Sequence, residues 1–195
     1  GFNYYSLLID GVAVADPSSE SFYGMGRMAS GIEIPNKEGD FYALKNVPHG
    51  DIRVKKYFSK ATNSWREMYV YTPPGYDNAT EKYPVLYLLH GGGEDQRGWA
   101  TQGKTNLILD NLIAENKAKP MVIAMLDGNM TGVTGFDERV LKAFENELKM
   151  GAIPFVESNF KVATDAKNRA LAGLSMGGLQ TLYAGVKNSD MFSSI

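Results

Sequence analysis

The most constraining feature of this sequence is a Gly-Leu-Ser-Met-Gly run at residues 173–177. It follows a short apolar run that begins at Arg169, and it precedes a helix-like run from Gly178 to Val186. A serine between a strand and a helix, with glycine on either side, is typical of a turn so tight that side chains cannot fit beside it. Such a turn exposes the hydroxyl of Ser175 at the end of a sheet, where it can act as a nucleophile.

The chain around this turn alternates strand-like and helix-like segments. Apolar runs typical of strands buried in a parallel sheet occur at 85–89, 121–126 and 169–174. Helical spacing of apolar residues predicts helices at 106–116, 138–159 and 177–187. The second helix is expected to break between Gly151 and Pro154. Strands alternating with helices predict a three-layer α/β sandwich, and the serine turn makes it an α/β-hydrolase.

Strand patterns also flank this central region. An antiparallel pair is expected at 52–59 and 67–72, and residues 192–195 would open one more strand. Residues 4–15 predict a hairpin around Asp10-Gly11, while the many glycine, serine and proline residues of 16–40 predict a loop or linker. We therefore expect two regions. Residues 1–46 would be the end of a small β domain with its linker, and residues 47–195 the first part of the α/β domain.

A glycine loop supports a catalytic interpretation of the serine. Leu-His-Gly-Gly-Gly at 89–93 follows the buried run 85–89. Acyl transfer develops negative charge on an oxygen, and a loop of this kind offers a backbone N–H to it. We expect the amides of Gly92 and Met176 to form this oxyanion hole, with Gly91 and Gly93 against the substrate. The alternative is a glycine-rich turn that holds a serine without a role.

The general base and acid of such a site are harder to find. His90 is expected to brace the glycine loop by hydrogen bonding, and His49 to be structural or solvent-facing. Asp190 is interpreted as part of a turn or cap. In this fold the general base and the acid both follow the nucleophile in the sequence. Only 20 residues (195 − 175) follow Ser175. We therefore expect both beyond residue 195, and the 195-residue chain alone to be almost inactive.

Three other side chains have two interpretations each. Trp99 follows the glycine loop and would either line the substrate cleft or pack in the core. Asp127 and Asn129 end the run at 121–126, where open α/β sheets bind ligands. An Asp-Gly-Asn sequence at that position equally suits a turn.

The composition of the chain argues against several classes of binding partner and cofactor. A net charge of −2 and scattered basic residues argue against nucleic acid or an anionic membrane, and the sequence contains no membrane-length apolar run. Without cysteine, and with two histidines, a thiol nucleophile is excluded and a metal centre is not expected. We expect no cofactor.

Several segments resemble carbohydrate esterase family 1, the esterase D-like feruloyl and acetylxylan esterases. They are Pro-His-Gly-Asp at 48–51, Tyr-Thr-Pro-Pro-Gly-Tyr at 71–76, the run 83–93 and the run 172–178. The N-terminal stretch, with Ile-Asp-Gly-Val at 9–12, Asp16-Pro17 and the run 30–35, resembles the end of an early-set β-sandwich that often precedes these esterases.

The resemblance implies a serine esterase on plant cell-wall polysaccharide, foremost a feruloyl esterase on arabinoxylan. Acetylxylan esterase is the close alternative, and enterochelin-type esterase or acyltransferase are more distant ones. A non-catalytic fragment is the rival interpretation of the chain as it stands. The resemblance also implies a secreted or periplasmic protein with xylan or its oligosaccharides as partner. Self-association through an unpaired sheet edge is a further expectation.

Overall fold

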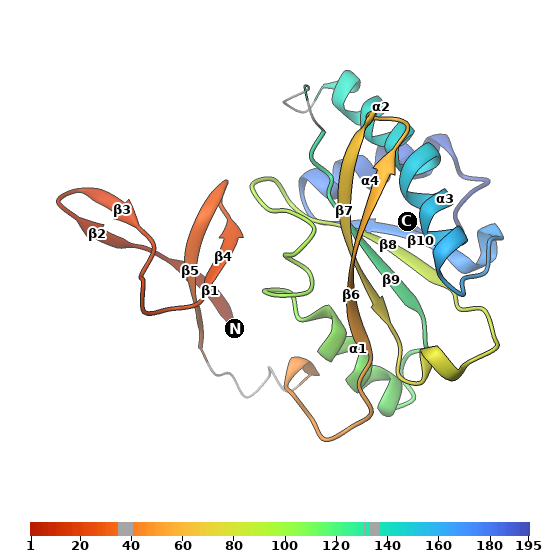
Figure 1. The fold of residues 1–195 in the computed structure, drawn as a ribbon, viewed down its shortest axis with the longest axis horizontal. Coiled ribbons are helices and arrows are strands. Elements are labelled where there is room, and N and C mark those ends of the chain that lie inside the picture. Colours follow the sequence, from red (N-terminus) through yellow and green to blue (C-terminus); the bar gives the residue numbers. More distant parts are fainter. Residues whose placement is uncertain (35–40, 131, 133–136) are drawn as a thin grey trace.

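The computed structural model describes residues 1–34, 41–130, 132 and 137–195. Its main sheet has the strand order β10-β8-β9-β7-β6 within these residues (Figure 1). The strands are β6 Asp51–Ser59, β7 Ser64–Thr72, β8 Val85–Leu89, β9 Val122–Leu126 and β10 Arg169–Gly173. β8 is parallel to both β9 and β10, whereas β7 is antiparallel to β9 and to β6. The three expected parallel strands are therefore neighbours, and the expected antiparallel pair adjoins them.

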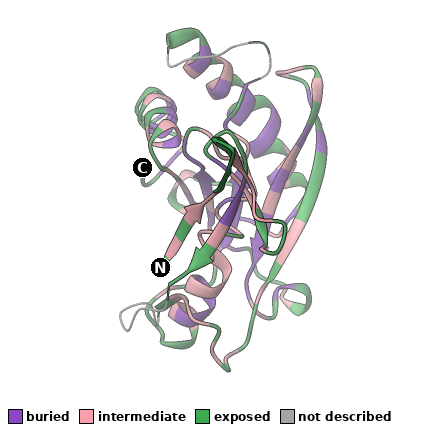
Figure 2. Ribbon diagram, turned by 90° about the vertical axis from the view of Figure 1, so that its left-hand side faces the viewer, coloured by how far each residue is buried: buried purple, intermediate pink, exposed green. Residues whose placement is uncertain are grey.

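Helices cover both faces of the main sheet. They are α1 Thr105–Ala114, α2 Glu138–Glu147, α3 Ile153–Asn159 and α4 Met176–Lys187. Leu89 of β8 packs in one apolar cluster with Phe144 of α2 and Val156 of α3. Its neighbour Leu88 points into a second cluster with Leu109 of α1. Because both faces of the central strands β8 and β9 are buried (Figure 2), the predicted three-layer α/β-hydrolase sandwich is confirmed.

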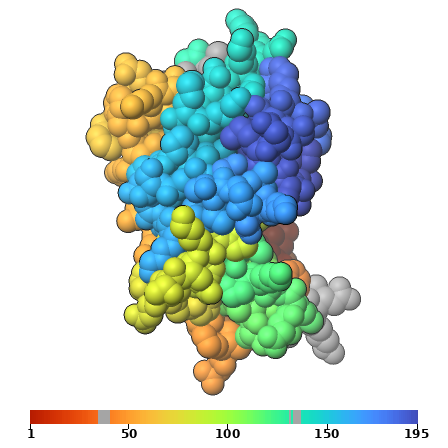
Figure 3. All heavy atoms as spheres, turned by 90° about the vertical axis from the view of Figure 1, so that its right-hand side faces the viewer, coloured from red at the N-terminus to blue at the C-terminus, as the bar shows by residue number. Residues whose placement is uncertain are grey.

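The expected break in the second helix is a change of helix type. A π-helical turn, η3 Leu148–Ala152, joins α2 to α3, and Pro154 lies in the first turn of α3, where its missing N–H costs nothing. Gly151 lies against the buried carboxylate of Glu147, and a Cβ there would come within 2.9 Å of its Cδ. Figure 3 shows α2 and α3 between the β6–β7 hairpin and the C-terminal residues. Short 3₁₀ turns occur at η2 Tyr76–Asn78 and η4 Ala166–Asn168.

The N-terminal region contains more strand than its composition predicts. The expected hairpin is confirmed as β2 Leu7–Ile9 and β3 Val12–Val14. The expected loop is wrong over much of its length, because β4 Ser21–Gly24 and β5 Arg27–Glu33 form a second hairpin within it. β5 also pairs with β1 Phe2–Tyr5, which gives the order β1-β5-β4. We call these three strands the N-terminal sheet. Residues 35–40 of the expected linker lie outside the described residues.

Aromatic packing explains this error. Gly31, which suggested a loop, lies within β5, and a Cβ there would come 2.6 Å from the ring of Phe22. The rings of Phe2 and Phe22 fill that space and meet edge to face. A glycine covered by rings from neighbouring strands is compatible with a sheet, whereas the sequence alone suggested a turn.

The last residues of the chain lie along β10. Ala170 and Ser194 form a parallel bridge, and the N–H of Leu171 donates to the carbonyl of Ser194 at 3.1 Å. The expected strand at 192–195 is thus represented by a single bridge. Self-association through this side of the sheet stays an untested prediction. None of the described helices is long and apolar enough to cross a membrane.

Candidate active site

Ser175 lies at the sharp turn between β10 and α4. Its backbone has φ 52° and ψ −111°, a conformation that costs about 1–3 kcal/mol for a residue with a side chain. The serine is exposed and directly precedes the first helical residue, Met176. The turn therefore presents the hydroxyl at the carboxyl end of a parallel strand, as the sequence predicts.

The two glycines of the motif are required by close backbone contacts. A Cβ at Gly173 would come 2.9 Å from the Cα of Gly177 and nearer still to its carbonyl group. A Cβ at Gly177 would come 2.7 Å from the carbonyl oxygen of His90, at the end of β8. Any side chain at either position would therefore push α4 away from the sheet.

The glycine loop lies beside this turn. A Cβ at Gly91 would come 3.6 Å from a methyl group of Leu174, the residue before the serine. The N–H of Gly91 donates to the carboxylate of Glu94 at 3.1 Å. Gly92 is exposed. Within the described chain, no hydrogen bond uses the N–H of Gly92 or of Met176.

His90 holds the glycine loop in place. Its ring is fully buried, and its Nε2 accepts from the N–H of Gly128 at 2.9 Å. Nδ1 lies 2.8 Å from the carbonyl of Gly91, to which it donates, and Nε2 also lies 3.3 Å from the carboxylate of Asp127. The predicted bracing role is confirmed, because this ring ties the end of β8 to the end of β9.

The turn after β9 is fixed from several sides. Asp127 accepts from the N–H of Asn129 at 2.9 Å, as in an Asx turn, and the Asn129 amide donates to the carbonyl of Glu94 at 3.1 Å. Gln180 of α4 donates to the carbonyl of Gly128 at 2.8 Å. The Asp-Gly-Asn sequence thus forms a turn, as one of its two interpretations predicts, and Asn129 binds the end of the glycine loop.

A buried arginine also holds the turn after β9, and the sequence analysis did not predict this role. Arg66 of β7 donates to the carbonyl oxygens of Asp127 at 2.5 Å and Asn129 at 3.0 Å. Its Nε lies 3.6 Å from the carboxylate of Glu147, which also accepts from the hydroxyl of Tyr57 at 2.7 Å. These groups come from two strands and a helix that is far from them in the sequence, so no local pattern could reveal them.

Trp99 packs against the main sheet, which is one of the two roles expected for it. Its indole N–H donates to the carbonyl of Leu89 at 2.9 Å, and its ring packs on the α1 side of the main sheet. It also lines a hollow of about 150 Å³ that reaches Leu174, beside the nucleophile. The other lining residues are Glu94, Gly98, Gln102 and Gly103.

Both histidines of the sequence are engaged away from Ser175. His49 lies 2.9 Å from the buried carboxylate of Asp110 and 2.9 Å from the carbonyl of Lys45, so both of its nitrogens face acceptors. Asp110 also accepts from Gly50 at 3.0 Å and Tyr71 at 2.5 Å. The predicted structural role of His49 is confirmed. Asp190 is exposed in the turn after α4.

The His49 contact predicts a pH-dependent stability. Hydrogen bonding to Asp110, then to the Lys45 carbonyl, raises the pKa of His49 above its usual value. A raised folded-state pKa adds stability below about pH 6.5, the unfolded value, and this stability is lost as the pH rises through the folded value. In urea unfolding from pH 5.5 to 8.5, we expect His49→Gln to lower the unfolding free energy most at the acid end. Parallel profiles for the two proteins would contradict this.

The described residues contain no group of three or more acidic, histidine or cysteine side chains that could hold a metal ion.

The fold and the serine turn define this chain as an α/β-hydrolase. The sequence model of the Esterase family matches residues 59–195. The chain therefore belongs to the Esterase family.

Individual relatives narrow the comparison. The chain is 42% identical over 199 residues to an endo-1,4-beta-xylanase/feruloyl esterase of Xylanibacter ruminicola, covering 98% of this chain and 27% of that protein. It is similar to a CE1 ferulic acid esterase from the anaerobic fungus Anaeromyces mucronatus, with 31% identity, a TM-score of 0.71, and coverage of 83% of this chain and 62% of that one. The enterobactin esterase of Shigella flexneri, at 23% identity and a TM-score of 0.62, shares the fold over 92% of this chain and 45% of its own. The chain thus spans about a quarter of the first relative and under two thirds of the fungal enzyme.

Proposed function

We propose that this chain carries the nucleophile of a serine carboxylic-ester hydrolase. In this reaction Oγ of Ser175 attacks the ester carbonyl carbon, and the N–H groups of Gly92 and Met176 stabilise the oxyanion. Collapse of the intermediate releases the alcohol and leaves an acyl-enzyme, which water cleaves to the free acid and the serine. The observation that carries the proposal is a strained, exposed serine beside a glycine loop, with both amide N–H groups unused within the described chain.

The reaction needs a base that takes the proton of Ser175 during attack and returns it to the leaving alcohol. His90 is fully buried, and His49 is bound to Asp110. The proposal therefore requires a histidine and an acid from outside these 195 residues, and it is made for the whole protein.

Ferulate esters of arabinoxylan are the substrate class we propose. Two findings support this choice: the 42% identity to a xylanase/feruloyl esterase, and a fungal relative at 32% identity and a TM-score of 0.70 that was solved in complex with ferulic acid. The hollow beside Trp99 and Leu174 offers an aromatic wall near the nucleophile. Acetylxylan is the second candidate, because an acetyl group needs no such wall. A catecholate ester of the enterochelin type is more distant, since that likeness supports the fold alone.

The neighbours of Gly92 have a different part in this proposal. The N–H of Gly91 donates to the carboxylate of Glu94, and the carbonyl of Gly93 accepts from the N–H of Gly26 at 2.8 Å. We propose that both residues contribute space for the substrate rather than hydrogen bonds, while Trp99 contributes a wall.

Parallel assays of the complete natural protein test the substrate class. We expect kcat/KM for methyl ferulate to exceed that for acetylated xylan oligosaccharides, per acetyl group, by at least about tenfold, because the aromatic wall favours an aryl group. A preference for acetylated xylan would support the second candidate. Activity on neither ester would contradict the proposed function on xylan.

Two wider features belong to the same proposal. We propose that residues 1–46 are the end of an early-set β domain, which the separate N-terminal sheet supports.

We also propose a secreted or periplasmic location, because polymeric xylan does not enter cells. Finding the protein only in the cytosolic fraction would contradict that location.

A further inference from the structure

We propose that the β4–β5 turn of the N-terminal sheet positions the glycine loop, so that this sheet orients the amide of Gly92. The N-terminal sheet would then position a catalytic loop as well as end a preceding β domain. The inference rests on the proposed function, because it concerns the oxyanion donor of that reaction.

A direct backbone bond joins the two parts. The N–H of Gly26 donates to the carbonyl of Gly93 at 2.8 Å. Gly26 and Met25 are the two central residues of the β4–β5 hairpin, with φ of 75° and 58°. Positive φ at both central residues is what a type I′ turn requires, and such a turn matches the twist of its strands. The donor therefore comes from a well-defined turn rather than from a loose loop.

The glycine loop is shaped to receive this turn. Gly93 has a φ of 80°, and a Cβ there would come 2.9 Å from the nitrogen of Gly26 and 3.3 Å from the Cα of Met25. Glycine at this position thus permits both the backbone conformation and the close approach of the turn. If Gly93 were glycine only to give the substrate access, its missing Cβ would not need to face the β4–β5 turn.

Other bonds of the loop are internal or come from the turn after β9. Gly91 and Glu94 bond to each other twice, through the N–H of Gly91 on the Glu94 carboxylate and the N–H of Glu94 on the Gly91 carbonyl. Asn129 holds the carbonyl of Glu94. The Gly26 bond is the described contact that fixes the Gly93 carbonyl, in the residue next to the proposed oxyanion donor.

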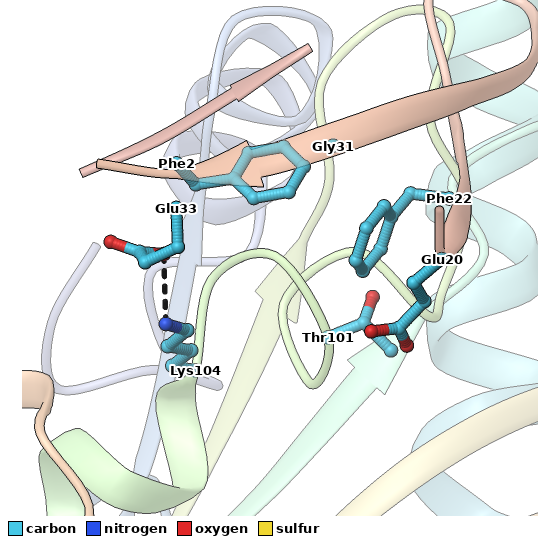
Figure 4. A pocket seen from close by; sticks show the side chains of 7 residues that line it. All are labelled: Phe2, Glu20, Phe22, Gly31, Glu33, Thr101 and Lys104. Carbon is cyan, nitrogen blue, oxygen red and sulfur yellow. Dashed lines mark hydrogen bonds and ion pairs between the residues drawn. The ribbon is translucent and has the colours of Figure 1, made fainter. Parts of the chain in front are cut away.

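The chain after the glycine loop is also attached to the N-terminal sheet. The amide of Gln102 donates to the hydroxyl of Tyr4 at 2.6 Å and to the carbonyl of Tyr23 at 3.1 Å. Lys104, at the start of α1, forms an ion pair with Glu33 at 2.8 Å, which Figure 4 shows at the edge of a hollow of about 250 Å³. In the same view the rings of Phe2 and Phe22 lie on the sheet side of this hollow. Segment 91–104 is thus held by the sheet at both ends.

The catalytic consequence follows from the geometry of oxyanion stabilisation. A donor must lie about 2.7–3.1 Å from the oxyanion, and a misplacement of about 1 Å can lower the rate by about a hundredfold. Loss of the Gly26 bond would leave the Gly93–Glu94 peptide with the longer bond from the Glu94 N–H to the Gly91 carbonyl, at 3.3 Å. The loop that carries the Gly92 amide, two peptide units away, would then be held less firmly. The transition state would lose stabilisation, while ground-state binding of the ester would change little.

Proline substitution in the complete natural protein tests this. Gly26→Pro removes the donated N–H, and we expect kcat for methyl ferulate to fall at least about tenfold with KM within about twofold. The matched control is Gly11→Pro, at the β2–β3 turn, where φ is also positive at 82°. We expect it to keep kcat within about twofold. Gly26→Ala keeps the N–H and its Cβ meets nothing within 4 Å, although a φ of 75° strains alanine. We expect this variant to lose stability but to keep a kcat much nearer to wild type than Gly26→Pro does.

The outcomes separate this inference from the proposed function. If kcat is unchanged in Gly26→Pro, or falls equally in Gly11→Pro, while activity still requires Ser175, the positioning role alone is overturned. If the wild-type protein has no activity that requires Ser175, the proposed function fails. Amide hydrogen exchange of the wild-type protein gives a readout that needs no variant to fold. The Gly26 amide should exchange at least about tenfold more slowly than the Gly11 amide, and equal protection would overturn the inference.

Discussion

Replacement of Ser175 by alanine should lower kcat/KM for methyl ferulate by a factor of about 10⁴ to 10⁶ in the complete protein. The loss is this large because the hydroxyl forms the acyl-enzyme bond, and no neighbouring group can take its place. The residual rate would come from the oxyanion donors and substrate binding. Since Ser175 is exposed, the same variant should keep its unfolding free energy within about 1 kcal/mol of wild type.

The matched control is Ser158→Ala. Ser158 is also exposed, and its hydroxyl donates only to the carbonyl of Pro154 within α3. We expect wild-type kinetics from this variant in the same steady-state assay. A Ser175→Ala protein that retains more than about a hundredth of the wild-type rate would contradict the assignment of the nucleophile.

Substitution of Gly173 by alanine should impair both folding and catalysis. The new Cβ would collide with the backbone of Gly177, where no flexible side chain can move aside, and the helix must shift away from the sheet. We expect the unfolding free energy to fall by about 3 kcal/mol and kcat by about a hundredfold, because the Met176 amide moves with the helix. Urea unfolding and steady-state kinetics measure the two effects.

Gly178→Ala is the internal control for this prediction. A Cβ at Gly178 would come 3.3 Å from the carbonyl oxygen of Gly173, and alanine has the higher helix propensity. We expect its unfolding free energy to stay within about 1 kcal/mol of wild type. Equal losses of stability in the two variants would show that the packing of the serine turn has been misinterpreted.

The sequence predicts the central sheet and the serine turn well, for identifiable reasons. β8 and β9 are uninterrupted apolar runs, and such runs suit strands that are buried on both faces. The glycines at 173 and 177 reflect backbone contacts between β10 and α4, which any chain with this turn must make. Local pattern and tertiary contact agree at these places, so the pattern was sufficient.

Contacts between distant segments account for what the sequence did not predict. The strands β4 and β5 were missed because Gly31 accommodates the rings of Phe2 and Phe22. The π-helical turn η3 directly follows Glu147, whose buried carboxylate contacts Tyr57 and Arg66. Neither the spacing of apolar residues nor a turn motif can predict such contacts between distant segments. The bond from the β4–β5 turn to the glycine loop belongs to the same class.

Covalent labelling of the complete protein with a fluorophosphonate ester tests the central claim most directly. Attack by an activated serine forms an oxygen–phosphorus bond and releases fluoride, and the oxyanion hole assists this step as it does acyl transfer. Trypsin then releases residues 170–187 as one peptide, which contains Ser175. We predict that mass spectrometry will find one phosphonyl group per chain, on Ser175, and none on the Ser175→Ala protein. An active enzyme that carries its label on another residue, or that resists labelling, would contradict the account.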